Sequence, residues 1–210
     1  MLETYLLNIN RDLEKYDFDR LIGYVSKDKK DRILRFRRFK DAQRSLLGEI
    51  LARYAICKGL GVRNTELVFG LNEYGKPVLI KPDGIHFNIS HSGEWVACAV
   101  ADSPVGIDIE MIKPVDYKIA ERFFSEKESF FLINQSEETR LKYFYMLWTL
   151  KESYIKAEGR GLSIPLNSFT VDLKGNPIII RDENNLIKNK THCYFEVQPD
   201  KYVLSICVIT

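Results

Sequence analysis

Two spacings of hydrophobic residues recur along the chain, and together they predict both helices and strands. Apolar side chains return every four positions from Leu46 to Ala55, which predicts an amphipathic helix that ends at Lys58–Gly59. Short apolar runs bounded by turn residues follow, and they predict strands over residues 67–71, 77–80, 86–90, 94–101 and 105–110. Upstream, Ser26 is placed to cap a helix with Asp28 in its first turn.

The second half of the chain repeats this order of elements. A helix is predicted over residues 138–158, followed by a strand over 169–173, a turn, a strand over 177–180 and a strand–turn–strand unit over 194–209. Gly175–Asn176–Pro177 lies 100 residues after Gly75–Lys76–Pro77. Short turns can resemble each other by chance, but the shared order favours one internal duplication. We therefore predict an α+β fold of two similar halves, residues 1–105 and 106–210, in one compact unit with a ligand cleft between them.

The composition is that of a folded globular protein and excludes several classes. Of 210 residues, 45% are hydrophobic and 29% charged, and the net charge of +2 is low for a protein that coats nucleic acid. No apolar run approaches the roughly 20 residues that span a membrane, and the first residues lack a secretory-signal pattern. Four cysteines without CxxC spacing favour a reduced, cytoplasmic protein over a zinc site.

The positive charge is concentrated in residues 27–40, which contain eight Lys or Arg and two Asp. A solvated helix face explains such a segment, and so does an anchor for phosphate groups or an acidic partner. The sequence pattern alone leaves both interpretations open.

Acidic residues form the first candidate site. In a strand over 105–110, Asp108 and Glu110 share one face while Ile107 and Ile109 point into the core. Two such carboxylates suit Mg²⁺, and the alternative is an exposed acidic strand end. In the helix over 138–158, Glu152 interrupts an apolar stripe, so it is either a third metal ligand or the partner of Lys156 in a helix salt bridge.

Two polar turns complete the candidates. The segment from Asn88 to Gly93 runs from a strand into a turn whose Ser90, His91 and backbone amides can hold a phosphate, or can simply satisfy one another in a hairpin. Ser125 and Glu128 fit a capping box at a helix start, which we favour over a catalytic role for Glu128. No P-loop or GxGxxG motif occurs.

Taken in order, these motifs resemble the Sfp-type 4′-phosphopantetheinyl transferases. The resemblance rests on RFRRFKDAQRSLLGEIL, EYGKP, HFNISHSGEWV, VGIDIE, RFFSEKE and FYMLWTLKESYIKAEGRGL, and it covers nearly the whole chain. It implies two α+β halves related by a pseudo-two-fold axis, each with a small, mainly antiparallel sheet packed on a long helix, and coenzyme A in the cleft. Phosphopantetheine then moves from coenzyme A to a serine of an apo acyl or peptidyl carrier protein, with release of adenosine 3′,5′-bisphosphate.

The resemblance also implies roles for individual residues. Asp108, Glu110 and Glu152 would bind Mg²⁺ with the pyrophosphate, Lys156 would contact phosphate, and Glu152 is the most plausible base for the serine proton, although other bases stay open. The remaining coenzyme A contacts would be Ser90, His91, Lys29, Arg32 and Arg44 toward the 3′-phosphate and Lys76 beside the adenine. Some members of the family have Lys in place of Arg32, which leaves the geometry of that contact open.

Carrier docking is expected over residues 112–124, next to the acids and in the second half. We expect a monomer that binds neither nucleic acid nor membrane. A nucleic-acid-binding module would explain the basic segment, but the three convergent acids would repel a phosphate backbone. The carrier could belong to a peptide synthetase, a polyketide synthase or a fatty-acid synthase.

Overall fold

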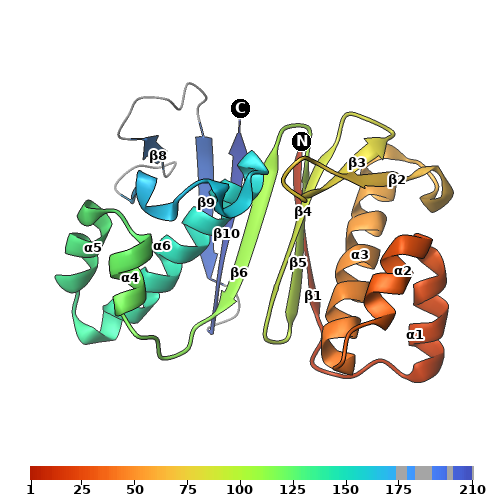
Figure 1. Cartoon of the computed structure of the whole chain (residues 1–210), viewed down its shortest axis with the longest axis horizontal. Helices are drawn as coiled ribbons and strands as arrows, with labels where there is room; N and C mark the ends of the chain where they lie inside the picture. Colours follow the sequence, from red (N-terminus) through yellow and green to blue (C-terminus); the bar gives the residue numbers. More distant parts are fainter. Residues whose placement is uncertain (174–178, 183–190, 198–200, 210) are drawn as a thin grey trace.

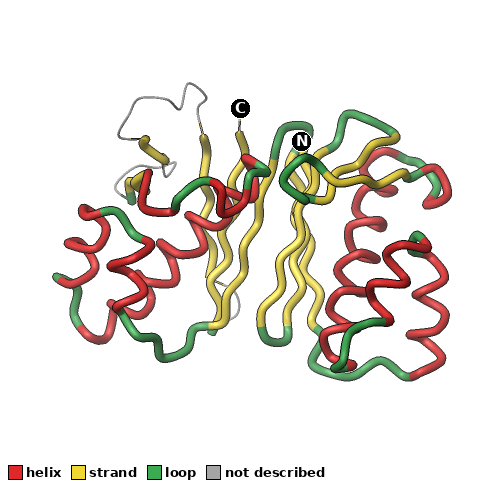
Figure 2. Tube along the Cα trace, viewed as in Figure 1, coloured by secondary structure: helices red, strands yellow, loops and turns green. Residues whose placement is uncertain are grey.

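Two three-stranded antiparallel sheets stand side by side in the middle of the molecule, and a long helix covers the outer side of each (Figure 1). The structure is a computed structural model that describes residues 1–173, 179–182, 191–197 and 201–209. Figure 2 shows the strands of these two sheets gathered at the centre, with most helices at the two outer sides.

The first half of the molecule runs from β1 to β5. Its elements are β1 (Leu2–Asn8), α1 (Lys15–Leu21), α2 (Lys27–Leu34), α3 (Phe39–Leu60), β2 (Val68–Leu71), β3 (Pro77–Lys81), β4 (His86–Ser92) and β5 (Trp95–Ala101). The second half contains β6 (Val105–Met111), α4 (Lys118–Phe123), α5 (Glu126–Ile133), α6 (Glu137–Glu158), β7 (Phe169–Asp172), β8 (Ile179–Asp182), β9 (Thr191–Val197) and β10 (Tyr202–Ile209).

The topology of the two halves matches element for element. The sheet order is β1–β5–β4 in the first half and β6–β10–β9 in the second, and each half adds a two-stranded hairpin, β2–β3 or β7–β8. Helix α3 thus corresponds to α6, and β1 corresponds to β6. This confirms the predicted α+β fold of two similar halves. Strand β1 and the short helices α1 and α4 were not predicted from the sequence.

The middle strands explain the longest apolar runs of the sequence. β5 and β10 each pair with a neighbour on both edges. All residues of β10, and all of β5 after Trp95, are buried. A strand covered on both faces needs apolar residues at every position rather than at alternate ones. No helix among the described residues is both long and apolar enough to cross a membrane.

The helix boundaries agree with the predicted signals except at one end. Ser26 caps α2, and the Ser125–Glu128 capping box opens α5, as predicted. Helix α3, however, continues past Lys58–Gly59 to Leu60. It ends there because Gly61, at φ 68°, is the residue that takes the left-handed conformation. The predicted Gly175–Asn176–Pro177 turn lies outside the described residues.

Candidate active site

A cleft of about 360 Å³ opens between the two halves. One wall comes from β4, and the other comes from β6 and α6. It is lined by Ile89, Ser90, His91, Asp108, Glu110, Trp148, Glu152 and Lys156. Six of the ten residues predicted for the site therefore meet in one cleft, although they lie up to 66 positions apart in the sequence.

The two walls are joined by side chains rather than by a continuous sheet. Asn88, Ser90 and Ser92 alternate along β4, and their side-chain oxygens accept hydrogen bonds from the amides of Ile107, Ile109 and Met111 at 2.9, 3.3 and 3.0 Å. These contacts satisfy amides of β6 that have no strand partner on that side. They also fix the position of β4 along β6, which places Ser90 next to Asp108.

Gly106 sets the distance between β6 and α6. A Cβ atom at this position would lie 1.9 Å from the carbonyl oxygen of Ser153 and 2.4 Å from the amide nitrogen of Ala157. Both atoms belong to the backbone of α6, so only glycine permits this approach. The close packing brings Glu152 and Lys156 of α6 to the acids of β6.

Lys156 pairs with Asp108 across this contact. Its Nζ lies 2.5 Å from Oδ1 of Asp108 and 3.3 Å from Oγ of Ser90, and Ser90 donates to the same Oδ1 at 3.0 Å. The alternative helix salt bridge from Lys156 to Glu152 is not formed among the described residues. The second oxygen of Asp108, Oδ2, is buried without a hydrogen-bond partner.

The three acids of the cleft destabilise one another in their charged forms. Burial is the largest cause that raises the pKa of Asp108, Glu110 and Glu152. The negative charge of Asp108 raises the pKa of the other two further, while Lys156 lowers all three. A cation placed among them would relieve this repulsion.

The donor set fits a hard divalent cation such as Mg²⁺. Carboxylate oxygens are its preferred protein ligands, and the unpartnered Oδ2 of Asp108 is a ligand atom without another function. Within the part of the chain that the structure describes, no three His, Cys, Asp or Glu side chains are already arranged so that they could hold a metal ion. Mg²⁺ commonly keeps several water or phosphate ligands, so an open set of acids agrees with its chemistry.

The predicted phosphate-binding cations lie outside the lining of the cleft. Lys29 of α2 pairs with Glu49 at 3.6 Å, and Arg32 of the same helix is exposed. Arg44 of α3 pairs with Asp41 at 3.1 Å and donates to the carbonyl of Gly93 at 3.2 Å. Burial, and then the charges of Arg44 and Lys156, lower the pKa of His91.

Lys76 also lies away from the cleft lining. It stands in the turn between β2 and β3, and its ammonium is directed at backbone carbonyls of the second half. The family resemblance implied a place for Lys76 beside the adenine but gave no sign of these carbonyl partners.

Four residues at the cleft were not predicted as site residues: Ile89 and Trp148 line it, and Asn88 and Ser92 join its walls. Trp148 is half-buried and lines the cleft one turn before Glu152. Asn88 and Ser92 belong to the same polar stretch as Ser90, and Ser92 donates to Glu110 at 2.7 Å. The alternation of 88, 90 and 92 was the available signal for one shared face.

Comparisons with known proteins cover both halves. The family model described as "4'-phosphopantetheinyl transferase superfamily" matches residues 104–207, and the one described as "4'-phosphopantetheinyl transferase, N-terminal" matches residues 13–103. The chain is 38% identical over 209 residues to the 4'-phosphopantetheinyl transferase Sfp of Bacillus subtilis (strain 168), covering 98% of this chain and 92% of the relative. It is 44% identical over 184 residues to the 4'-phosphopantetheinyl transferase gsp of Aneurinibacillus migulanus, covering 88% and 77%. Among solved structures, a holo-(acyl-carrier-protein) synthase from Bacillus anthracis, in complex with CoA (3',5'-ADP), matches 51% of this chain and 95% of its own with 19% identity and a TM-score of 0.44.

Proposed function

The chain belongs to the 4′-phosphopantetheinyl transferase superfamily, and we propose that its cleft transfers phosphopantetheine from coenzyme A to a serine of an apo carrier protein. The observation that carries this function is the 38% identity over nearly the full length of both chains to a transferase of this kind. The cleft agrees with it, because it joins three carboxylates and a lysine at one face.

The reaction is a substitution at the β-phosphorus of coenzyme A. The serine oxygen forms a bond to that phosphorus, the bond to the bridging oxygen of the adenosine 3′,5′-bisphosphate breaks, and the serine proton passes to a base. The phosphopantetheine ends on the serine, and the nucleotide leaves with the negative charge.

Glu152 is the base that the geometry favours. Asp108 is engaged by Lys156 and Ser90, and Glu110 accepts a hydrogen bond from Ser92. Glu152 forms no hydrogen bond or ion pair to another residue in the described ranges. Burial and the charges of Asp108 and Glu110 raise its pKa, which suits proton uptake near neutral pH.

Asp108, Glu110 and Glu152 are proposed to hold one Mg²⁺ together with pyrophosphate oxygens. When bound, the metal neutralises charge on the pyrophosphate. Lys156 would keep its short contact with Asp108 and exchange its longer contacts, to Ser90 at 3.3 Å and to the carbonyl of Ile107 at 3.4 Å, for the phosphate.

The 3′-phosphate end of coenzyme A is proposed to lie over the first half. Arg44 and His91 are close enough for the charge of one to lower the pKa of the other. Lys29 and Arg32 extend this positive surface along α2, with Ser90 at the edge of the cleft. The second half would then provide the metal site and the surface for the carrier.

The setting that we propose is a monomer in the cytoplasm. The cysteines at 57 and 98 are free, which agrees with a reducing compartment.

The direct test of this function is transfer itself. The chain is incubated with coenzyme A, Mg²⁺ and an apo carrier protein, and the intact mass of the carrier is followed. Addition of one phosphopantetheine group to the carrier serine is expected, and a carrier of unchanged mass would contradict the function.

Glu152→Gln tests the role of the third acid, because it removes the charge and nearly preserves the shape. Turnover is expected to fall at least 100-fold, as is common when a general base is lost. Near-normal turnover at limiting Mg²⁺ would remove Glu152 from both proposed roles. The exposed Glu138→Gln, near the start of α6, is the matched control.

A further inference from the structure

The ammonium of Lys76 is held entirely by backbone carbonyls of the second half. Its Nζ lies 3.1 Å from the carbonyl oxygen of Val105, 2.5 Å from that of Lys156 and 3.4 Å from that of Ala157. An ammonium has three donors, and these three carbonyls account for all of them. No donor of the side chain is left to recognise an adenine.

The turn that carries Lys76 makes a second bond to the same place. Nδ2 of Asn72 donates to the carbonyl of Gly159 at 2.7 Å. Oδ1 of Asn72 accepts hydrogen bonds from the backbone amides of Tyr74 at 3.0 Å and Lys76 at 2.8 Å, and these bonds stabilise the turn. The β2–β3 turn is therefore built to face the end of α6.

The backbone carbonyls at the end of α6 lack hydrogen-bond partners within their own helix. The last four carbonyls of a helix have no amide of their own helix to bind, and they carry partial negative charge. Here Lys76 and Asn72 from the first half bind three carbonyls between Lys156 and Gly159. Glu158 adds a negative charge that favours the ammonium.

We propose that Lys76 is a positioning residue: it fixes the end of α6 against the start of β6, and thereby holds the side chain of Lys156 in the cleft. This rests on the proposed role of Lys156 at the phosphates. One of the carbonyls that Lys76 binds belongs to Lys156 itself. Another belongs to Val105, which lies three residues before Asp108, the ion-pair partner of Lys156. The same contact holds both members of that ion pair.

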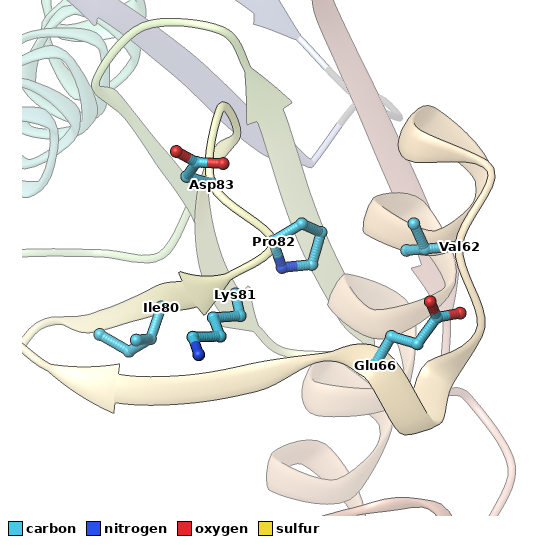
Figure 3. A pocket seen from close by; sticks show the side chains of 6 residues that line it. All are labelled: Val62, Glu66, Ile80, Lys81, Pro82 and Asp83. Carbon is cyan, nitrogen blue, oxygen red and sulfur yellow. The ribbon is translucent and has the colours of Figure 1, made fainter.

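The cost of this arrangement shows that the contact is specific. Burial lowers the pKa of Lys76 to about 8. A lysine in solvent would avoid that cost. Lys81 is exposed beside a shallow hollow of about 520 Å³ that Val62, Glu66 and Pro82 also line (Figure 3).

The test compares Lys76→Met with Lys81→Met, which removes an exposed ammonium from the same hairpin. Transfer is measured by intact mass with the full chain, coenzyme A, Mg²⁺ and an apo carrier protein. Lys76→Met is expected to lower kcat by about 10- to 100-fold, the effect of a displacement of about 1 Å in a catalytic group. Lys81→Met is expected to match the wild type.

A double-mutant cycle separates positioning from a general structural effect. If Lys76 acts through Lys156, then Lys76→Met has little further effect in a Lys156→Ala background, whereas independent effects multiply. Multiplying effects, a kcat within about twofold of the wild type, or a rise only in the KM for coenzyme A would overturn the proposal. The last result would instead indicate direct contact with the nucleotide.

Hydrogen exchange gives a readout that does not depend on turnover. In Lys76→Met, amides of the last turn of α6 are expected to exchange faster, while those at the end of α3 keep their wild-type rates. Unchanged exchange at α6 would contradict the proposal. If Lys76→Met does not fold, Lys76→Gln, which keeps an amide donor, takes its place in all three measurements. Hydrogen exchange needs no turnover. A wild type without transfer activity would therefore contradict the proposed function, while the exchange rates would still test the contact of Lys76.

Discussion

Each acid of the cleft is held by a different set of partners, and this separates their chemical roles. Asp108 is bound by a lysine and a serine, Glu110 by a serine, and Glu152 by no residue of the described ranges. Strand alternation predicted the shared face of Asp108 and Glu110, and Ile107 and Ile109 are indeed fully buried. The partners could not be predicted, because Lys156 and Ser90 reach Asp108 from other segments of the chain.

His91 is the residue whose charge should respond to the nucleotide. Burial lowers its pKa from the ordinary 6.5, so the free chain carries a neutral imidazole at pH 7. A phosphate near the ring favours the charged form, so adenosine 3′,5′-bisphosphate is expected to raise the pKa of His91. The nucleotide should therefore bind more tightly as the pH falls from 8 to 6, because binding takes up a proton.

NMR titration of the imidazole with and without the nucleotide measures this shift. His86, whose pKa is also lowered by burial but which does not line the cleft, is the internal control. An unchanged His91 midpoint on saturation would show that the phosphate lies elsewhere.

Helix α6 presents different charges to its two sides. Glu152 and Lys156 face the cleft, while Lys151 is fully buried in the second half. Nζ of Lys151 lies 2.7 Å from Oε2 of Glu128 and binds the carbonyls of Leu166 and Phe169 at 2.8 and 2.6 Å. The capping-box residue Glu128 thus also holds α6 to the start of α5. A helical repeat could predict the cap but not the partner from another helix.

Removing Lys151 alone should be costly. Lys151→Met leaves the carboxylate of Glu128 buried without its cation, and loss of one partner of such a pair costs about 3–5 kcal/mol of unfolding free energy. Urea denaturation measures this loss, with the exposed Lys142→Met on the same helix as control. The double variant with Glu128→Gln should recover part of it, since the amide oxygen can still accept the amide of Val171. A Lys151→Met chain as stable as the wild type would show that the pair contributes nothing.

Gly106 should tolerate no side chain. Gly106→Ala puts a methyl group into the backbone of α6, which must move away from β6. We expect a loss of about 1–3 kcal/mol or more in stability. A fall in kcat should accompany it, because Glu152 and Lys156 move with the helix. Gly23→Ala, whose Cβ would meet nothing within 4 Å, is the matched control for thermal unfolding and transfer. Equal behaviour of the two variants would contradict this account of the strand–helix packing.

At the scale of the whole molecule, repeated element order was enough to predict two similar halves but not how they are joined. Turn residues and apolar runs are local signals, and they located most strands. The joint depends on Asn88, Ser92 and Lys76, whose side chains bind backbone atoms of the other half. Backbone amides and carbonyls leave no trace in the sequence, so this part of the site needed the three-dimensional structure.

The segment 112–124 lies beside the cleft between the two halves. We predict that the carrier protein docks on this segment. The charge of Lys113 lowers the pKa of Glu110, and Phe123 packs edge to face on Trp148 of the cleft at 5.7 Å. Phe124 is a buried core residue, so it is not part of this surface. A docked serine must reach the β-phosphate in line, which requires binding close to the cleft.

Lys113 and Lys118 are the exposed charges that test this docking surface, whereas Tyr117 is half-buried against Phe144 and would report on packing instead. Exposed charge pairs contribute about 0.2–1 kcal/mol each, so reversing both lysines to Glu is expected to raise the KM for the carrier by up to roughly tenfold. The KM for coenzyme A should stay unchanged, because its proposed contacts lie on β4, α2, α3 and the acids. Reversal of both Lys15 and Arg20 to Glu on the distant α1 changes the net charge by the same amount and is the control. Equal disturbance of both KM values, or of neither, would place the docking surface elsewhere.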